Sequence, residues 1–188
     1  MKYLFESNFY AKYQAPNADE LIKKIDTYTD DSIDNAHFTW GNKSRSDKIP
    51  LKWEDYMELL LPSIRLFGEE FKVDIEFQLF DPWIKFYKRG DHQEVHSHHS
   101  HMSAVFLGND GEDFSKFYFI DSNWSQISNP LEMILTRAYT YDINLKAGDV
   151  MFFPSYMLHG VSPHKSDIVR KSLSFNFDIN KVRRWENE

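Results

Sequence analysis

From residue 73 onward, the apolar and polar positions follow the pattern of β-strands. Short runs rich in β-branched and aromatic residues recur along this half of the chain, and turn-forming stretches such as RGD, KAGD and SPHKSD separate most of them. The runs are VDIEFQLF (73–80), WIKFYK (83–88), SAVFLG (103–108), KFYFID (116–121), AYTYDIN (138–144), DVMFFPS (149–155) and RKSLSFNFDIN (170–180). Many short strands without intervening helices predict a mainly β fold, a sandwich or jelly roll.

The first 72 residues carry helix signals instead. Asn17 and Glu20 form an Asn-x-x-Glu capping pattern, so we expect a short helix that continues to about Tyr28. A longer amphipathic helix is expected to begin near Lys52, because apolar residues recur from there at steps of three and four. Pro62 lies inside this pattern and is expected to kink or split the helix.

These patterns together predict one domain over residues 1–188. Residues 1–72 would form a helical N-terminal part, and residues 73–182 would form the jelly-roll core. We expect the helices to pack outside one of the two sheets.

Composition and charge narrow the classes of function. The chain has no cysteine, which excludes disulfides, zinc–thiolate sites, iron–sulfur clusters and thiol nucleophiles. A formal net charge of −7 argues against a general phosphate-binding surface, and no apolar run is long enough for a transmembrane helix. The N-terminus MKYLFESNFY is too short and polar for a secretory signal. We therefore expect a cytoplasmic protein with neither a nucleic-acid nor a membrane partner.

Five of the eight histidines lie within ten residues, in the stretch HQEVHSHHSH (92–101). On an extended strand residues i and i+2 share a face, so His96 and His98 would project together with Cα atoms about 6.6 Å apart. Two imidazoles rarely make a tight site. His159, just after the apolar run DVMFFPS, is the best remote candidate for a third ligand.

Other interpretations of this cluster are open from the sequence. His92 and Glu94 form an H-x-E pair, and a carboxylate is an ordinary iron ligand. His99 and His101 form a second H-x-H pair on the opposite face. Most of these side chains could also belong to a solvated loop.

The run RKSLSFNFD has one polar and one apolar face. Arg170, Ser172, Ser174, Asn176 and Asp178 share the first, and Lys171, Leu173, Phe175 and Phe177 share the second. The polar face either meets water on an edge strand or lines a cavity that holds an anion. Arg170 favours the cavity, because a guanidinium binds a carboxylate through two parallel hydrogen bonds.

The order of these motifs resembles a known family. H-x-H, SAVFL, GDVMFFPS, LHGVSPH and RKSLSFN follow one another as in the Fe(II)- and 2-oxoglutarate-dependent oxygenases, most closely the small oxygenases of bacteria and phages, over roughly residues 80–180. The resemblance implies a double-stranded β-helix with iron at its open end. His96, His98 and His159 would be the metal ligands.

The resemblance also assigns the co-substrates. Arg170 would bind the far carboxylate of 2-oxoglutarate with Ser172 as a second hydrogen-bond donor, and O2 would be the oxidant. His98 stands where the wider superfamily usually has Asp or Glu, so the metal site would be one unit more positive than a site with a carboxylate.

Two classes of function follow from these residues. The first is a dioxygenase that couples decarboxylation of 2-oxoglutarate to oxidation of a small molecule or peptide. The alternatives are a non-enzymatic metal-binding or cupin-like jelly roll and a three-histidine dioxygenase that does not use 2-oxoglutarate. Surface or packing roles are favoured over substrate contact for Tyr118, Asp121, Trp124 and Arg137. A homodimer is possible.

Overall fold

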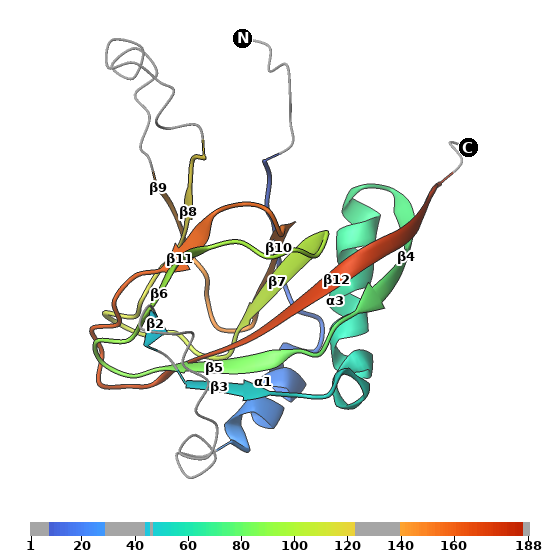
Figure 1. Ribbon diagram of the computed structural model, residues 1–188. Coiled ribbons are helices and arrows are strands. Elements are labelled where there is room, and N and C mark those ends of the chain that lie inside the picture. Colours follow the sequence, from blue (N-terminus) through green and yellow to red (C-terminus); the bar gives the residue numbers. More distant parts are fainter. Residues whose placement is uncertain (1–7, 29–43, 46, 123–139, 186–188) are drawn as a thin grey trace, which may run out of the picture.

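Two antiparallel sheets form the framework of the computed structural model, which describes residues 8–28, 44–45, 47–122 and 140–185 (Figure 1). The larger sheet has the order β1 (Ala11–Gln14), β10 (Asp149–Pro154), β7 (Met102–Leu107), β12 (Arg170–Arg184), β5 (Trp83–Tyr87) and β3 (Asp47–Pro50), and β4 (Val73–Leu79) also pairs with β12. The smaller sheet has the order β2 (Ser44–Arg45), β6 (His92–His96), β11 (His159–Val161), β8 (Phe117–Ile120) and β9 (Thr140–Ile143).

The order in which the chain visits the two sheets defines the fold. β5, β6, β7 and β8 alternate between the larger and the smaller sheet, and β9, β10, β11 and β12 alternate in the reverse sense. This is the winding of a double-stranded β-helix, so the predicted jelly roll is confirmed. An apolar cluster that includes Val105, Phe117, Phe153 and Val161 fills part of the space between the sheets.

Two helices cover the outer face of the larger sheet. α1 (Ala18–Asp26) and α3 (Met57–Glu70), which follows the 3₁₀ turn η2 (Trp53–Asp55), bury their apolar faces in the main core (Figure 1). Phe67 of α3, for example, stacks on Phe152 of β10 with ring centroids 5.1 Å apart. The prediction that helices pack outside one sheet is confirmed.

The division at residue 72 was wrong in detail. The N-terminal part is not only helical, because β1, β2 and β3 also lie within it and join the edges of both sheets. Unpaired sheet edges expose backbone hydrogen-bonding groups, and short segments that pair with β10, β6 and β5 satisfy them. The sequences of these three strands, AKYQ, SR and DKIP, contain too few apolar residues to leave a periodic pattern.

The sequence placed both helices correctly, but two expected local features, a capping hydrogen bond and a break at Pro62, are not found. Asn17 is the N-cap residue of α1, yet its side chain makes no capping hydrogen bond. α3 continues without a break across Pro62, so of the expected kink or split the split does not occur. Proline removes one helical hydrogen bond, to the carbonyl of Glu58, whereas Leu60, Ile64 and Phe67 are held by burial in the core.

β12 is an interior strand of the larger sheet. It pairs with β7 on one side and with β5 and β4 on the other. Phe175 and Phe177 lie in the outer core, whereas Arg170, Ser172 and Ser174 face the space between the sheets. The edge-strand interpretation of its polar face is therefore wrong. The polar face lines a pocket, as the cavity interpretation requires, and the anion in that pocket stays a prediction.

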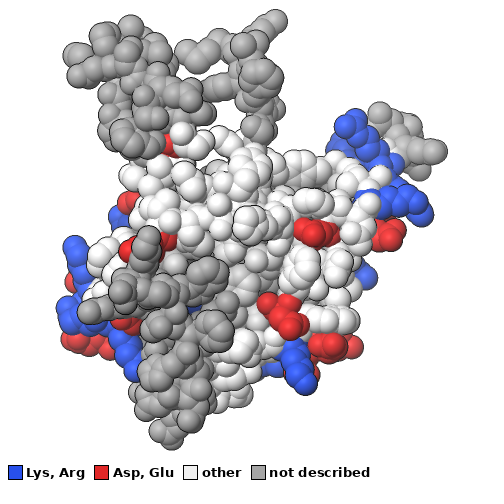
Figure 2. Space-filling view, viewed as in Figure 1, with Lys and Arg blue, Asp and Glu red and all other residues white. Residues whose placement is uncertain are grey.

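Charges on the face seen in Figure 2 are mixed, with basic and acidic side chains interspersed along its sides. None of the helices in the described ranges is both long and apolar enough to cross a bilayer.

Candidate metal centre and its pocket

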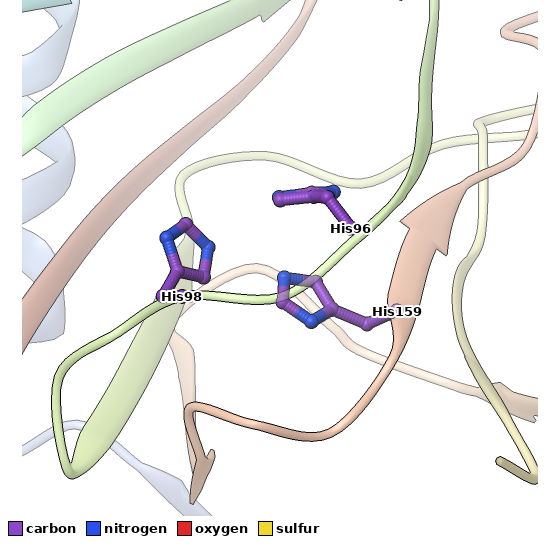
Figure 3. A group of neighbouring side chains, drawn as sticks. All are labelled: His96, His98 and His159. Carbon is purple, nitrogen blue, oxygen red and sulfur yellow. The ribbon is translucent and has the colours of Figure 1, made fainter.

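Three histidine side chains meet at one end of the space between the sheets. The ring centroids lie 5.0 Å apart for His96 and His98, 4.3 Å for His96 and His159, and 5.2 Å for His98 and His159. One nitrogen from each ring lies within 4.8 Å of the others (Figure 3). An ion bound to all three at ordinary metal–nitrogen distances would draw these nitrogens closer together.

Strand pairing places these rings. His96 is the last residue of β6, and His159, the first residue of β11, is its direct partner across the smaller sheet. His98 lies two residues beyond β6, where its backbone N–H donates to the carbonyl of Ser155 at 2.8 Å. The expectation that His96 and His98 project to one place is met, although only His96 belongs to the strand.

Hydrogen bonds to the main chain orient two of the rings. Nδ1–H of His96 donates to the carbonyl of Glu94 at 2.7 Å, and Nδ1–H of His159 donates to the carbonyl of Met157 at 2.8 Å. This fixes the tautomer that carries its lone pair on Nε2, which is the form that binds metals.

Burial keeps these imidazoles neutral. Burial, together with the proximity of His96, lowers the pKa of His159 to about 3, and burial also lowers the pKa of His96. A neutral ring is the metal-binding form, so both are ready to bind at neutral pH.

The other cluster residues do not join this group. Among the described residues, no Asp, Glu or further His lies with the three rings. His99 is exposed, and His101 Nδ1 accepts a hydrogen bond from the backbone N–H of Ile179 at 2.9 Å. The donor set of three imidazoles suits iron, nickel, copper or zinc.

A β-bulge shapes β6 just before His96. His159 pairs with His96 and Val161 pairs with Gln93, so three steps along β6 oppose two steps along β11. The extra residue lets Gln93 and His96, three positions apart, face the same side, which a regular strand would not allow. Glu94 and Val95, which lie between them, are exposed.

Arg170 lies in the same pocket and is 2% exposed. Its Nη1 is 3.5 Å from the hydroxyl of Ser172, and its guanidinium lies 5.0 Å from the ring centroid of Tyr87. No Asp or Glu of the described residues forms an ion pair with it. A buried guanidinium without an anionic partner is costly, so this position is suited to an anionic ligand.

A polar chain connects β12 to the loop that holds His98. The hydroxyl of Ser103 donates to Oδ1 of Asn176 at 2.8 Å and lies 2.8 Å from the hydroxyl of Ser155. Because the carbonyl of Ser155 holds the backbone of His98, the polar face of β12 also supports the metal end of the pocket.

Sequence reasoning missed two polar residues of this pocket, Lys85 and Gln93. Lys85 is 8% exposed, and its ammonium donates to the side-chain oxygen of Gln93. The signal was present in WIKFYK, where Trp83, Lys85 and Tyr87 alternate with the core residues Ile84 and Phe86. A lysine inside such an apolar run was a cue to a polar cavity.

The substrate candidates near the pocket mouth divide into two groups. Trp124 and Arg137 lie outside the described residues. Tyr118 packs against the backbone of β11, because a Cβ added at Gly160 would stand 2.7 Å from its hydroxyl oxygen. This agrees with a packing role for Tyr118. Asp121, just beyond β8, is half-buried.

Solved structures share this architecture. HygX from Streptomyces hygroscopicus, in a crystal structure with nickel and 2-oxoglutarate bound, is 10% identical, with a TM-score of 0.64 over 93% of this chain and 84% of that chain. The non-heme alpha-ketoglutarate-dependent carbocyclase SnoK from nogalamycin biosynthesis is 12% identical, with a TM-score of 0.67 over 95% and 83%. A Pseudomonas putida prolyl-4-hydroxylase is 15% identical, with a TM-score of 0.63 over 96% and 95%.

These likenesses establish the fold, and the sequence itself establishes the family. A search of curated proteins found no match. The family model described as "Putative 2OG-Fe(II) oxygenase" matches residues 81–176, which is half of the chain and spans the three histidines and Arg170. The family suggested by the order of the sequence motifs is thereby confirmed: the chain belongs to the 2OG-Fe(II) oxygenases.

Proposed function

We propose that the protein is an Fe(II)- and 2-oxoglutarate-dependent dioxygenase that couples decarboxylation of 2-oxoglutarate to oxidation of a small molecule or peptide. One observation carries the proposal: three convergent imidazoles line a single pocket with a buried guanidinium that forms no ion pair with a described carboxylate. A metal-chelating ligand with a second carboxylate fits both ends of such a pocket.

His96, His98 and His159 would hold the metal. Three protein ligands leave room on a six-coordinate ion for a bidentate 2-oxo acid and for O2. Bound Fe(II) would supply the activation of O2 and the oxidising chemistry. The protein contributes neutral ligands, because burial lowers the pKa of both His96 and His159.

Arg170 and Ser172 would hold the far carboxylate of 2-oxoglutarate. Both side chains are buried on the inward face of β12, and Tyr87 lies beside the guanidinium. Phe117, Phe153 and Val161 add an apolar part to the lining of the pocket. In such surroundings a charge-assisted, two-point contact is stronger than in water.

The three-histidine donor set leaves a metal-binding jelly roll or a cupin-like dioxygenase as alternatives. Neither has a use for a buried cation in the metal pocket. Arg170 therefore supports the 2-oxoglutarate-dependent reaction over both.

The test uses purified protein loaded anaerobically with Fe(II). With 2-oxoglutarate present, admission of O2 should produce succinate above a control without protein, since enzymes of this family usually decarboxylate slowly even without their substrate. Protein that holds Fe(II) but neither binds 2-oxoglutarate nor yields succinate would leave the binding-module alternative in place.

Arg170→Ala distinguishes binding of 2-oxoglutarate from binding of the metal. Loss of a buried charged contact should weaken 2-oxoglutarate binding by about 2–5 kcal/mol, which is more than tenfold. Calorimetry on Co(II)-loaded protein would measure this, with Co(II) affinity itself as the control, which should not change. An unaltered 2-oxoglutarate affinity in this variant would instead favour the cupin-like reading.

A further inference from the structure

We infer that Lys85 is a second cationic anchor for the far carboxylate of the co-substrate and acts together with Arg170. The inference rests on the proposed function and extends it to a residue outside the motifs that mark the family in this sequence. It makes the pocket selective for a dicarboxylate over a 2-oxo acid that lacks the second carboxylate.

Strand register brings Lys85 to this place. Lys85 of β5 pairs directly with Ser172 of β12, and Tyr87, the next inward residue of β5, pairs with Arg170. Directly paired residues on one face have Cβ atoms about 5 Å apart. Because Nη1 of Arg170 reaches to 3.5 Å from the hydroxyl of Ser172, the two cations and this hydroxyl surround one region of the pocket.

A hydrogen bond holds the Lys85 side chain across the interior. Its ammonium donates to the side-chain oxygen of Gln93, which belongs to β6 of the opposite sheet. Gln93 faces inward because of the bulge before His96. This hydrogen bond keeps the ammonium inside the pocket. Without it, a long lysine side chain would extend towards water.

The position along β5 distinguishes the far carboxylate from the metal-binding end. The ring of Trp83 lies 6.0 Å from that of His98, so Trp83 marks the metal end of the strand. Lys85 lies one inward position farther from the metal, between Trp83 and Tyr87. Its backbone is thus level with Ser172, and its ammonium extends towards β6, close enough to His96 and His159 to add to the lowering of both pKa values by burial.

The charge of the pocket favours a negatively charged group beside Lys85 and Arg170. Its lining, taken from the described residues, includes Lys85 and Arg170 but no Asp or Glu. Two buried cations that share a cavity repel each other at low dielectric, and a bound divalent metal adds to the positive potential. The far carboxylate of a bound 2-oxoglutarate would bring a negative charge between the two cations and so reduce this repulsion. A 2-oxo acid without a second carboxylate brings no negative charge to this region.

The experiment compares two ligands in one variant. 2-Oxopentanoate has the same five-carbon chain and 2-oxo acid end as 2-oxoglutarate but lacks the far carboxylate. In Co(II)-loaded protein, Lys85→Met should weaken 2-oxoglutarate binding at least tenfold and leave 2-oxopentanoate affinity within about twofold. Calorimetry gives both affinities without any need for turnover.

Lys171→Met is the matched control. Lys171 lies on β12 but faces outward, where its ammonium pairs with Asp26 at 2.7 Å. Removing this charge changes the net charge of the protein equally and should leave both ligand affinities unchanged. Equal weakening of 2-oxoglutarate in Lys171→Met would overturn the inference, because the effect would then be one of overall charge.

Lys85→Gln is a second variant in case Lys85→Met fails to fold. The shorter amide is neutral but can still hydrogen-bond to Gln93, and it should reproduce the selective loss of 2-oxoglutarate. If both ligands weaken together in the two variants, or if neither weakens, Lys85 is a structural bridge between the sheets and the inference is wrong. If wild-type protein binds neither ligand, the proposed function falls as well.

Discussion

At the scale of single residues, the metal site depends on main-chain carbonyls as much as on imidazoles. The carbonyls of Glu94 and Met157 each accept a hydrogen bond from a histidine two residues farther along the chain. In many metal sites a carboxylate side chain performs this orienting role. Here side-chain substitutions at Glu94 and Met157 should be tolerated, because the orienting oxygens belong to the backbone.

His159→Ala should abolish tight binding of Co(II) or Fe(II). His159 is 3% exposed and bonded to both neighbouring strands, so no described side chain can take its place. His99→Ala should bind metal as the wild type does, since that side chain is exposed and outside the group. Equilibrium dialysis with metal analysis would measure both. A site that survives loss of His159 but not of His92 would mean that the ligand set is wrong.

At the scale of elements, the two faces of β12 have different roles: one packs in the core and the other lines the pocket. The outward face carries Phe175 and Phe177, which are fully buried, and the inward face carries the polar residues of the pocket. Stability should therefore respond to one face and ligand binding to the other.

Phe175→Ala should lower the free energy of unfolding by about 3–5 kcal/mol, because it leaves a cavity among closely packed rings. Ser174→Ala, one residue away on the inward face, should change it by about 1 kcal/mol or less. Urea unfolding followed by circular dichroism would compare them. Similar losses in both variants would show that the two faces are not independent.

Deleting one residue of the bulge in β6 would test whether the bulge is needed for metal binding. Removing Val95 takes out one residue between Gln93 and His96, which leaves these two at i and i+2 of a regular strand and still on one face. We expect metal affinity to stay within about tenfold of the wild type. Deleting Ser97, which separates His96 from His98, should remove metal binding. The reverse result in dialysis would mean that the bulge itself positions His96.

At the scale of the whole molecule, the main features of the fold could be predicted from the sequence because they follow from periodicity. Seven of the strands and both helices lie where apolar patterns placed them. β1, β2, β3, β6 and β11 could not be found in this way, because these short strands carry too few apolar residues to leave a pattern and are defined by their partners.

The candidate site was only partly predictable for a similar reason. His96, His98, His159, Arg170 and Ser172 were found because they stand in recognisable motifs, and the structure brings them into one pocket. The positions of Lys85 and Gln93 in the pocket depend on the pairing of β5 with β12 and on the bulge in β6. Such register is a property of the assembled sheets, and one chain segment does not reveal it.

The helices and the jelly roll should unfold as one unit. Leu21 of α1, Phe67 of α3 and Phe152 of β10 belong to a single buried cluster, so neither part can lose its partner and keep its core. Thermal unfolding should show coincident transitions in far-ultraviolet circular dichroism and in tryptophan fluorescence. Two separate transitions would contradict the prediction of one domain.

The interior position of β12 has a consequence for biosynthesis. The ribosome makes β12 after β4, β5 and β7, the strands that it pairs with. Until residue 170 and those after it have emerged, β5 and β7 each keep an unpaired edge, and the larger sheet lacks its middle. Arg170 then arrives as the first residue of the strand that closes the gap. A nascent chain therefore exposes these strand edges during this interval, when they are open to incorrect pairing, and it gains the pocket that contains Arg170 only when the sheet is completed.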